Sequence, residues 1–182
     1  MRFHMIDPNA ATGKAKRLLD GVQAKLGMTP NMMKAMANSP AVLEGYLNLS
    51  TALAGGLLDA RTRERIALAV SQQNRCGYCL AAHTVTGGMS GLTEAEIRSS
   101  RESAANDSRT AAALAFCREL VAQRGSVPAP ALQQVRDAGW SDGEIGEMVA
   151  HTALTIFTNY FNLTAETDID FPAVPIELAV AA

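Results

Sequence analysis

Signals that start and stop helices recur at short intervals along this sequence, and they limit what the chain can fold into. Residues 93–96 and 141–144 both form capping boxes, in which a hydroxyl and a carboxylate three residues apart bond each other's backbone N–H groups. Asp59 is a further N-cap, and Gly27 follows the last apolar residue of its segment. No segment alternates apolar and polar residues for long, as a half-buried strand would. We therefore predict an all-α fold.

The predicted helices follow one another closely. Gly87 and Gly88 are expected to end the fifth helix, and the Ser/Ala/Asn run 99–108 is typical of a linker. The last helix is apolar almost all round at its C-terminal end, which indicates burial in the core or at a subunit interface. Prolines in the final segment predict a non-helical tail from about 166 to 182. The predicted helices cover residues 12–26, 30–36, 41–54, 60–73, 76–86, a short stretch from 93, 106–123, 128–138 and 145–163.

The size and composition of the chain exclude several classes of protein. Its 182 residues suit one domain, which we place at 1–182. With 48% hydrophobic residues and a net charge of −2, it is too apolar to be disordered and too balanced for a nucleic-acid binder. No apolar run approaches the roughly 18 residues of a membrane span, and the first residues lack the apolar stretch of a signal peptide. We expect a cytoplasmic protein without nucleic-acid or membrane partners.

Two thiols and an imidazole stand close together in the motif Cys76-x-x-Cys79-x-x-x-His83. On a helix these three residues share one face over two turns. A helix start near Cys76, the imidazole of His83 one turn after Cys79, and the charge of Arg75 each favour a thiolate. Proximity to His83 favours Cys79 as the nucleophile and Cys76 as the resolving thiol, although the opposite order is also known for such pairs. Because a histidine base needs an orienting group, Glu64 in the preceding helix is the candidate carboxylate.

These residues together resemble a known family. Glu64, eleven intervening residues, the Cys76-x-x-Cys79 pair and then His83 are similar to the alkylhydroperoxidase D (AhpD) family, within the larger carboxymuconolactone decarboxylase superfamily. The specific motif covers residues 64–83. Weaker similarity to peroxidase-related members extends over most of the chain and includes Ala82-His83, 157–162 and 170–172.

The resemblance implies a function and a division of roles. It implies an all-α AhpD-like fold in a homo-oligomer, commonly a trimer or hexamer, that reduces hydroperoxides. Cys79 is then the peroxidatic thiol, Cys76 the resolving thiol, and Glu64 with His83 the proton relay. An external dithiol, either a thioredoxin-like or a lipoyl-type protein, restores the pair, and no cofactor or metal is expected. One departure is Tyr78, which stands where AhpD has a histidine and which cannot accept a proton near neutral pH.

Several alternatives stay open at this point. The same dithiol chemistry serves a general disulfide oxidoreductase or a redox sensor, and a carboxymuconolactone decarboxylase-type lyase would not need the cysteine pair. A zinc-binding Cys/His protein would need a fourth ligand, and the candidates are Glu64, Cys117, His151 and His4. Glu64 could instead pair with Arg61 or Arg65 on a solvated face, and the chain could be a helical interaction protein without catalysis. We expect Cys117 and His151 to be buried packing residues, with an apolar pocket near Leu80.

Overall fold

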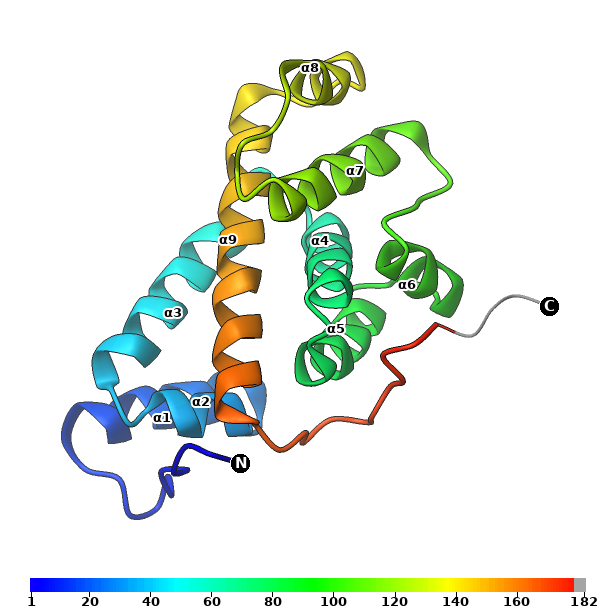
Figure 1. The fold of residues 1–182 in the computed structure, drawn as a ribbon. Coiled ribbons are helices and arrows are strands. Elements are labelled where there is room, and N and C mark those ends of the chain that lie inside the picture. The colour runs from blue at the N-terminus through cyan, green and yellow to red at the C-terminus, as the bar shows by residue number, and fades with distance from the viewer. Residues whose placement is uncertain (179–182) are drawn as a thin grey trace.

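The computed structural model describes residues 1–178, and within that range the chain forms nine α-helices and no strand (Figure 1). The predicted all-α fold is therefore confirmed. None of the helices between residues 1 and 178 is long and apolar enough to cross a membrane. The helices are α1 (Gly13–Leu26), α2 (Asn31–Met36), α3 (Pro40–Ala54), α4 (Ala60–Gln73), α5 (Gly77–Met89), α6 (Glu94–Arg101), α7 (Ser108–Ala122), α8 (Ala129–Asp137) and α9 (Asp142–Ala165).

Helix α4 is the centre of the fold. It packs against α5, α6, α7 and α9, and every residue from Arg65 to Ser71 is buried (Figure 1). Asp59 starts this helix, because its carboxylate accepts the backbone N–H of Thr62 at 2.8 Å. A helix covered on several sides fixes the position of each of its side chains, Glu64 included.

The capping signals in the sequence fall at the true helix starts. Thr93 and Ser141 both complete capping boxes, at the N-termini of α6 and α9, and Gly27 ends α1 with a φ of 74°. Trp140, just before the second box, packs in the same buried cluster as Ile145, as in a hydrophobic staple.

Two sequence-based boundaries are wrong. Helix α5 does not end at Gly87 and Gly88 but runs through both to Met89. A Cβ on Gly87 would lie 3.3 Å from Cδ1 of Leu92, so the glycine allows α5 to approach the start of α6 closely. The run 99–108 is not one linker either, because α6 includes Ser99 to Arg101 and the connection to α7 is only 102–107.

Helix α9 is not enclosed by the core of this chain along its apolar side chains. Its inward face carries mostly polar side chains, while large apolar side chains on the outward face are exposed. The exposed apolar residues are Val149, Phe157, Tyr160 and Leu163. The buried polar residues are His151, Thr152, Thr155, Thr158, Asn159 and Asn162. Within this single chain the core does not bury α9 on several sides, and burial at a subunit interface, the other alternative, stays a prediction.

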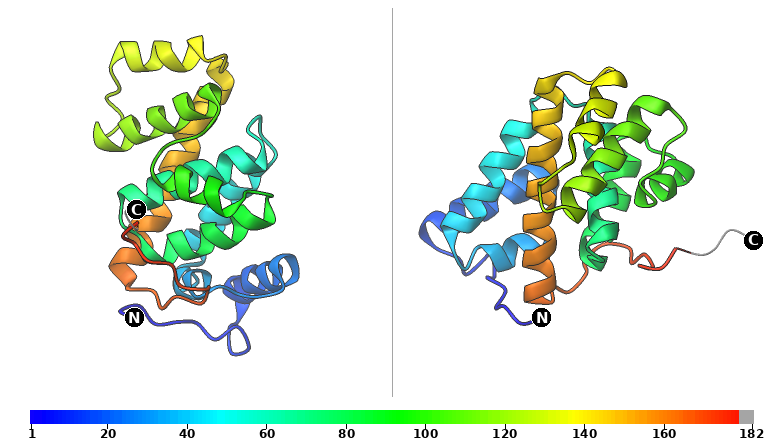
Figure 2. Two further views of the ribbon diagram at one scale, coloured as in Figure 1. Left: turned by 90° about the vertical axis from the view of Figure 1, so that its right-hand side faces the viewer. Right: turned by 45° about the horizontal axis from the view of Figure 1, so that its top comes forward.

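The tail after α9 is non-helical up to Leu178, and it passes beneath α5 (Figures 1 and 2). Gly77 at the start of α5 faces it, since a Cβ there would lie 3.6 Å from Cδ1 of Ile176. Arg101 holds the tail by donating to the carbonyls of Pro175 at 2.6 Å and Ile176 at 3.1 Å. The last four residues of the predicted tail, 179–182, lie outside the described residues.

Candidate active site

The turn between α4 and α5 brings the two thiols to the centre of the molecule. Arg75 has a φ of 55°, in the left-handed region, which reverses the chain within one residue. Cys76 is the N-cap of α5, and its backbone N–H bonds the carbonyl of Ser71 at 3.0 Å. The side chain of Arg75 is mostly exposed and pairs with the carboxylate of Glu177 at 2.6 Å, and an effect of its charge on the thiols stays a prediction.

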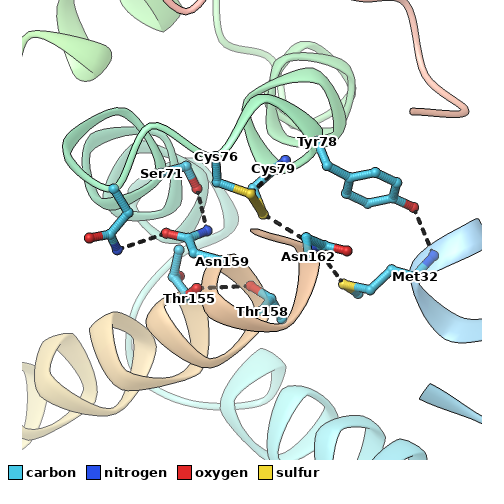
Figure 3. The surroundings of a disulfide bond; sticks show 10 residues. Met32, Ser71, Cys76, Tyr78, Cys79, Thr155, Thr158, Asn159 and Asn162 are labelled. Atoms are coloured by element: carbon cyan, nitrogen blue, oxygen red, sulfur yellow. Dashed lines mark hydrogen bonds between the residues drawn. A yellow bond between two sulfur atoms is a disulfide. The ribbon is translucent and has the colours of Figure 1, made fainter. Parts of the chain in front are cut away.

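Cys76 and Cys79 form a disulfide within a buried cluster contributed by α1, α2, α3 and α5 (Figure 3). Cys76 Sγ accepts the backbone N–H of Cys79 at 3.4 Å, as an N-cap side chain does. Asn162 of α9 donates from Nδ2 to Cys79 Sγ at 3.4 Å, and also lies 3.2 Å from Sδ of Met32. The sulfur of Cys79 thus accepts a hydrogen bond from another helix, α9, whereas the sulfur of Cys76 accepts one from its own helix, α5.

Glu64 of α4 and His83 of α5 face each other, as the sequence motif predicts. Oε2 of Glu64 lies 2.9 Å from Nδ1 of His83 and also accepts the hydroxyl of Thr86 at 2.6 Å. The alternative pairing with Arg61 or Arg65 is wrong, because both of these arginines bind Glu96.

The charge state of Glu64 decides which nitrogen of His83 is free. Burial by itself raises the pKa of Glu64, but His83, the hydroxyl of Thr86 and the charge of Arg63 outweigh it and hold that pKa below its ordinary value. An ionised carboxylate only accepts hydrogen bonds, so Nδ1 of His83 carries the hydrogen between them. In the neutral imidazole Nε2 is then the basic nitrogen.

A cavity of about 850 Å³ opens beside these groups. Cys79, His83, Glu64 and Thr86 line it, whereas Cys76 does not. Spacing on α5 therefore places Cys79 and His83 on the cavity side, with Cys76 behind. The pocket was expected near Leu80 and the preceding helix. Arg63, Glu64 and Ala67 of that helix line the cavity, whereas Leu80 is fully buried and does not.

Tyr78 belongs to the wall of the same cavity and acts only as a neutral group. Its hydroxyl accepts the backbone N–H of Met32 at 3.2 Å, and its ring packs edge-on against Phe171 (Figure 3). Burial first, and the nearby Asp170 carboxylate second, raise the pKa of Tyr78 well above its ordinary value. It is therefore protonated at physiological pH and does not take the place of a basic histidine.

The other candidate residues lie apart from the sulfurs. Cys117 is buried as predicted, and burial raises the pKa of its thiol to about 12. His151 is also buried, as predicted, but it lines the cavity, and within residues 1–178 its Nε2 has no hydrogen-bond partner. Among residues 1–178 no group of three or more His, Cys, Asp or Glu side chains is arranged to hold a metal ion.

Sequence reasoning missed two groups that contact the central residues, Asn162 and Thr86. A signal for Asn162 was present, because amides at positions 159 and 162 interrupt an otherwise apolar stretch. A polar side chain in a buried helix needs a partner, and the thiols were the unpaired groups available. Thr86 stands one turn after His83, which puts it on the same side of α5.

Comparison with known proteins fits this geometry. Residues 40–122, which include the entire motif, match the model of the carboxymuconolactone decarboxylase family. The described fold is similar to the peroxidase-related protein from Ralstonia eutropha JMP134 with an alkylhydroperoxidase AhpD core, at a TM-score of 0.82 and 23% identity. That superposition covers 93% of this chain and 92% of the other. Residues 40–122 are therefore similar in sequence to the carboxymuconolactone decarboxylase family, and the fold of the described chain is that of the AhpD core structure.

Other AhpD-like and related chains are also similar. The debrominase Bmp8, solved as its C82A variant with 2,3,4-tribromopyrrole, has a TM-score of 0.80 at 16% identity, covering 93% of this chain and 92% of that one. An uncharacterised protein of Haemophilus influenzae is 51% identical over 45 residues, which are 24% of this chain. The matched part spans only 40% of the length of that relative. This AhpD-like fold therefore occurs in proteins of more than one named activity.

Proposed function

We propose that this AhpD-like protein is a thiol-dependent hydroperoxide reductase. The observation that carries the proposal is the side of the disulfide on which the cavity opens. Cys79, the Glu64–His83 pair and Thr86 all line that cavity, while Cys76 lies behind Cys79 and bonds it. A small hydroperoxide in the cavity would meet one sulfur and one base, with the second sulfur ready to react next.

The first step uses the reduced pair. Nε2 of His83 takes the proton of Cys79, and Glu64 stabilises the imidazolium through Nδ1. The Cys79 thiolate attacks the terminal oxygen of the hydroperoxide, so that an S–O bond forms and the O–O bond breaks. The alkoxide that leaves takes the proton from His83 and becomes the alcohol, and Cys79 becomes a sulfenic acid.

The second step closes the disulfide. The Cys76 thiol loses its proton as its sulfur attacks the Cys79 sulfur. The S–S bond forms, the S–O bond breaks, and the leaving hydroxide takes up that proton to become water. An external dithiol then reduces the disulfide by exchange and is itself oxidised. Cys76 and Cys79 are only 1% and 3% exposed. This burial favours reactants small or slender enough to enter the cavity, and it applies to the external dithiol as well as to the hydroperoxide.

The proposal includes assembly and location. The exposed apolar residues of α9 form the surface that we expect a second copy to cover, in a trimer or hexamer of the kind the family resemblance implies. A reducing cytoplasm would keep the dithiol donor available. Light scattering during size-exclusion chromatography measures the subunit number directly.

The test is rapid-mixing reaction of the reduced protein with cumene hydroperoxide. We expect Cys79→Ser to abolish the fast reaction, and Cys76→Ser to consume one equivalent of peroxide without forming a disulfide. Cys117→Ser is the matched control, because that buried thiol does not line the cavity. Full peroxide reactivity in Cys79→Ser would show that the attacking sulfur is misassigned.

A further inference from the structure

The side chains that line the cavity carry a net positive charge, whereas the protein as a whole carries a net negative charge. The chain carries a net charge of −2, yet the ionised side chains lining the cavity are three cations and one acid. The cations are Arg17 and Lys25 from α1 and Arg63 from α4, and the acid is Glu64. Because Glu64 is bound by His83 and Thr86, it is already occupied. The cavity thus has an excess of positive charge.

None of these three cations forms an ion pair within the described chain. Arg63 donates one N–H to the carbonyl of Leu58 at 2.5 Å, which leaves most of its five donors unused. By contrast, the neighbouring Arg61 and Arg65 on the same helix both bind Glu96. The guanidinium of Arg63 therefore differs from its neighbours: it is half-buried at the cavity, and although its charge acts on Glu64 and Glu147, it forms an ion pair with neither.

A second unused group lies near Arg63. His151 of α9 lines the same cavity, and its buried Nε2 has no partner in residues 1–178. Burial first, and the charge of Arg63 second, lower the pKa of His151 and outweigh Glu147, Glu64 and the backbone of Leu53, which raise it. A buried polar nitrogen without a partner is costly, so a ligand or water that bonds it stabilises the site.

The remaining walls of the cavity are mostly apolar. They come from α1, α2, α3, α9 and the tail, and include Leu18, Val22, Met33, Leu47, Leu154 and Phe171. The volume of about 850 Å³ lies within the roughly 300–1,000 Å³ typical of small-molecule sites. Apolar walls beside unpaired cations match a ligand with a long apolar part and one anionic group.

We propose that this cavity binds an amphipathic carboxylate, with the carboxylate at Arg63 and the hydrocarbon against the apolar walls. Arg63 binds a planar carboxylate through paired N–H donors, while Arg17 and Lys25 on the exposed rim attract the anion. Combined with the proposed function, on which this part rests, the substrate class is the hydroperoxides of long-chain carboxylic acids. The carboxylate site itself requires no peroxide chemistry.

Calorimetric titration of the oxidised protein with decanoate and with 1-decanol tests the binding site. A charge-assisted hydrogen bond predicts that decanoate binds at least about tenfold more tightly than the alcohol. Arg63→Gln is expected to remove that preference, and Arg63→Lys to restore part of it. Arg118→Gln removes the same charge from an exposed position on α7 outside the cavity and is expected to change neither ligand's binding.

Two results would overturn the inference: equal binding of decanoate and 1-decanol to the wild type, or the same decanoate affinity in Arg63→Gln as in Arg118→Gln. Thermal melting checks that each variant is folded. If Arg63→Gln does not fold, the decanoate affinity of Arg63→Lys is compared with that of Arg118→Gln instead. A third result, in which neither decanoate nor 1-decanol binds the wild type, would also contradict the inference.

A kinetic comparison separates this inference from the proposed function. The substrates are the 13-hydroperoxide of linoleic acid, its methyl ester and cumene hydroperoxide. We expect the acid to react faster than the ester in the wild type and at the rate of the ester in Arg63→Gln. If cumene hydroperoxide reacts but the acid and the ester react at equal rates, the proposed carboxylate site is wrong and the proposed reductase function is supported. If none reacts while decanoate binding depends on Arg63, the reductase is wrong and the site stands.

Discussion

Oε2 of Glu64 lies 2.9 Å from Nδ1 of His83, joining the central helix α4 to the helix that carries both thiols. The carboxylate reaches across from a different element, so the orientation of the imidazole depends on the packing of α4 against α5. Thr86 donates to the same Oε2 at 2.6 Å and fixes the carboxylate in turn. A base oriented in this way is ready to take a proton without first rearranging.

Glu64→Gln should slow the reaction of the reduced protein with cumene hydroperoxide by about 10²-fold or more, because general acid–base catalysis by a positioned group contributes about 10²–10⁴-fold. An amide carries no charge to stabilise the imidazolium of His83. Rapid mixing at pH 7 measures the effect. Glu94→Gln, at an exposed site on α6, is the control and should react like the wild type. Equal rates in the two variants would exclude Glu64 from the relay.

The same carboxylate predicts how stability depends on pH. The folded-state pKa of Glu64 lies below its ordinary value of 4.5, so the ionised form is favoured by folding. Its stabilisation is fully present above pH 4.5 and is lost as the pH falls through the lower folded-state value. Urea unfolding of the wild type and of Glu64→Gln should therefore differ most above pH 4.5 and converge at lower pH. A constant difference down to pH 3 would contradict the assigned shift.

The sequence predicted the helices well because their ends carry local signals. Asp59, Thr93 and Ser141 bond backbone N–H groups within three residues, and such contacts do not depend on the rest of the fold. The error at Gly87 has the opposite origin. A glycine usually stops a helix, but here its missing side chain makes room for Leu92, which only the tertiary packing reveals.

The part of the candidate site that depends on local spacing was also predictable from the sequence. Cys79 and His83 are one helical turn apart, so spacing alone placed them together on the side that faces the cavity. The contact of Glu64 with His83 depends on how two helices pack, and the family resemblance supplied it where spacing could not. The cavity is formed by six helices and the tail, so no local pattern predicted that Arg63 and His151 would share it.

Asn162 is expected to lower the pKa of the Cys79 thiol, because its Nδ2 donates to Sγ at 3.4 Å. In Asn162→Ala the pH midpoint for alkylation of reduced Cys79 by iodoacetamide should therefore shift upward. Cys117 should stay unmodified throughout, since burial raises its pKa to about 12. Mass spectrometry of the digested protein assigns the label to each cysteine.

Asn159→Ala is the matched control for that measurement. Asn159 is one turn away on the same helix, but its amide bonds Ser71 and Asn74 and not a sulfur (Figure 3). Its removal should cost about 1–3 kcal/mol of stability, as losing a buried hydrogen-bonding group does, without moving the alkylation midpoint. The same midpoint in both variants would mean that Asn162 acts on packing alone.

Arg101 is expected to control access to the disulfide from the side of the tail. It donates to the carbonyls of Pro175 and Ile176 and to the side chain of Gln72, which holds the tail against the start of α5. Arg101→Ala should therefore release the tail, speed its cleavage by a protease and speed reduction of the disulfide by dithiothreitol. Loss of these bonds is expected to cost about 1–3 kcal/mol in urea unfolding.

Arg75→Ala distinguishes this anchoring from a general effect of removing a charge near the tail. Its ion pair with Glu177 is exposed, with both side chains more than half accessible, and exposed pairs contribute about 0–1 kcal/mol. It should therefore leave the reduction rate almost unchanged, while Arg101→Ala raises it several-fold. Because Cys76 is 1% exposed and does not line the cavity, a reductant that attacks it must approach past the tail. Unchanged reduction in Arg101→Ala, together with faster cleavage of the tail, would show that the reductant reaches the disulfide through the cavity and Cys79 instead.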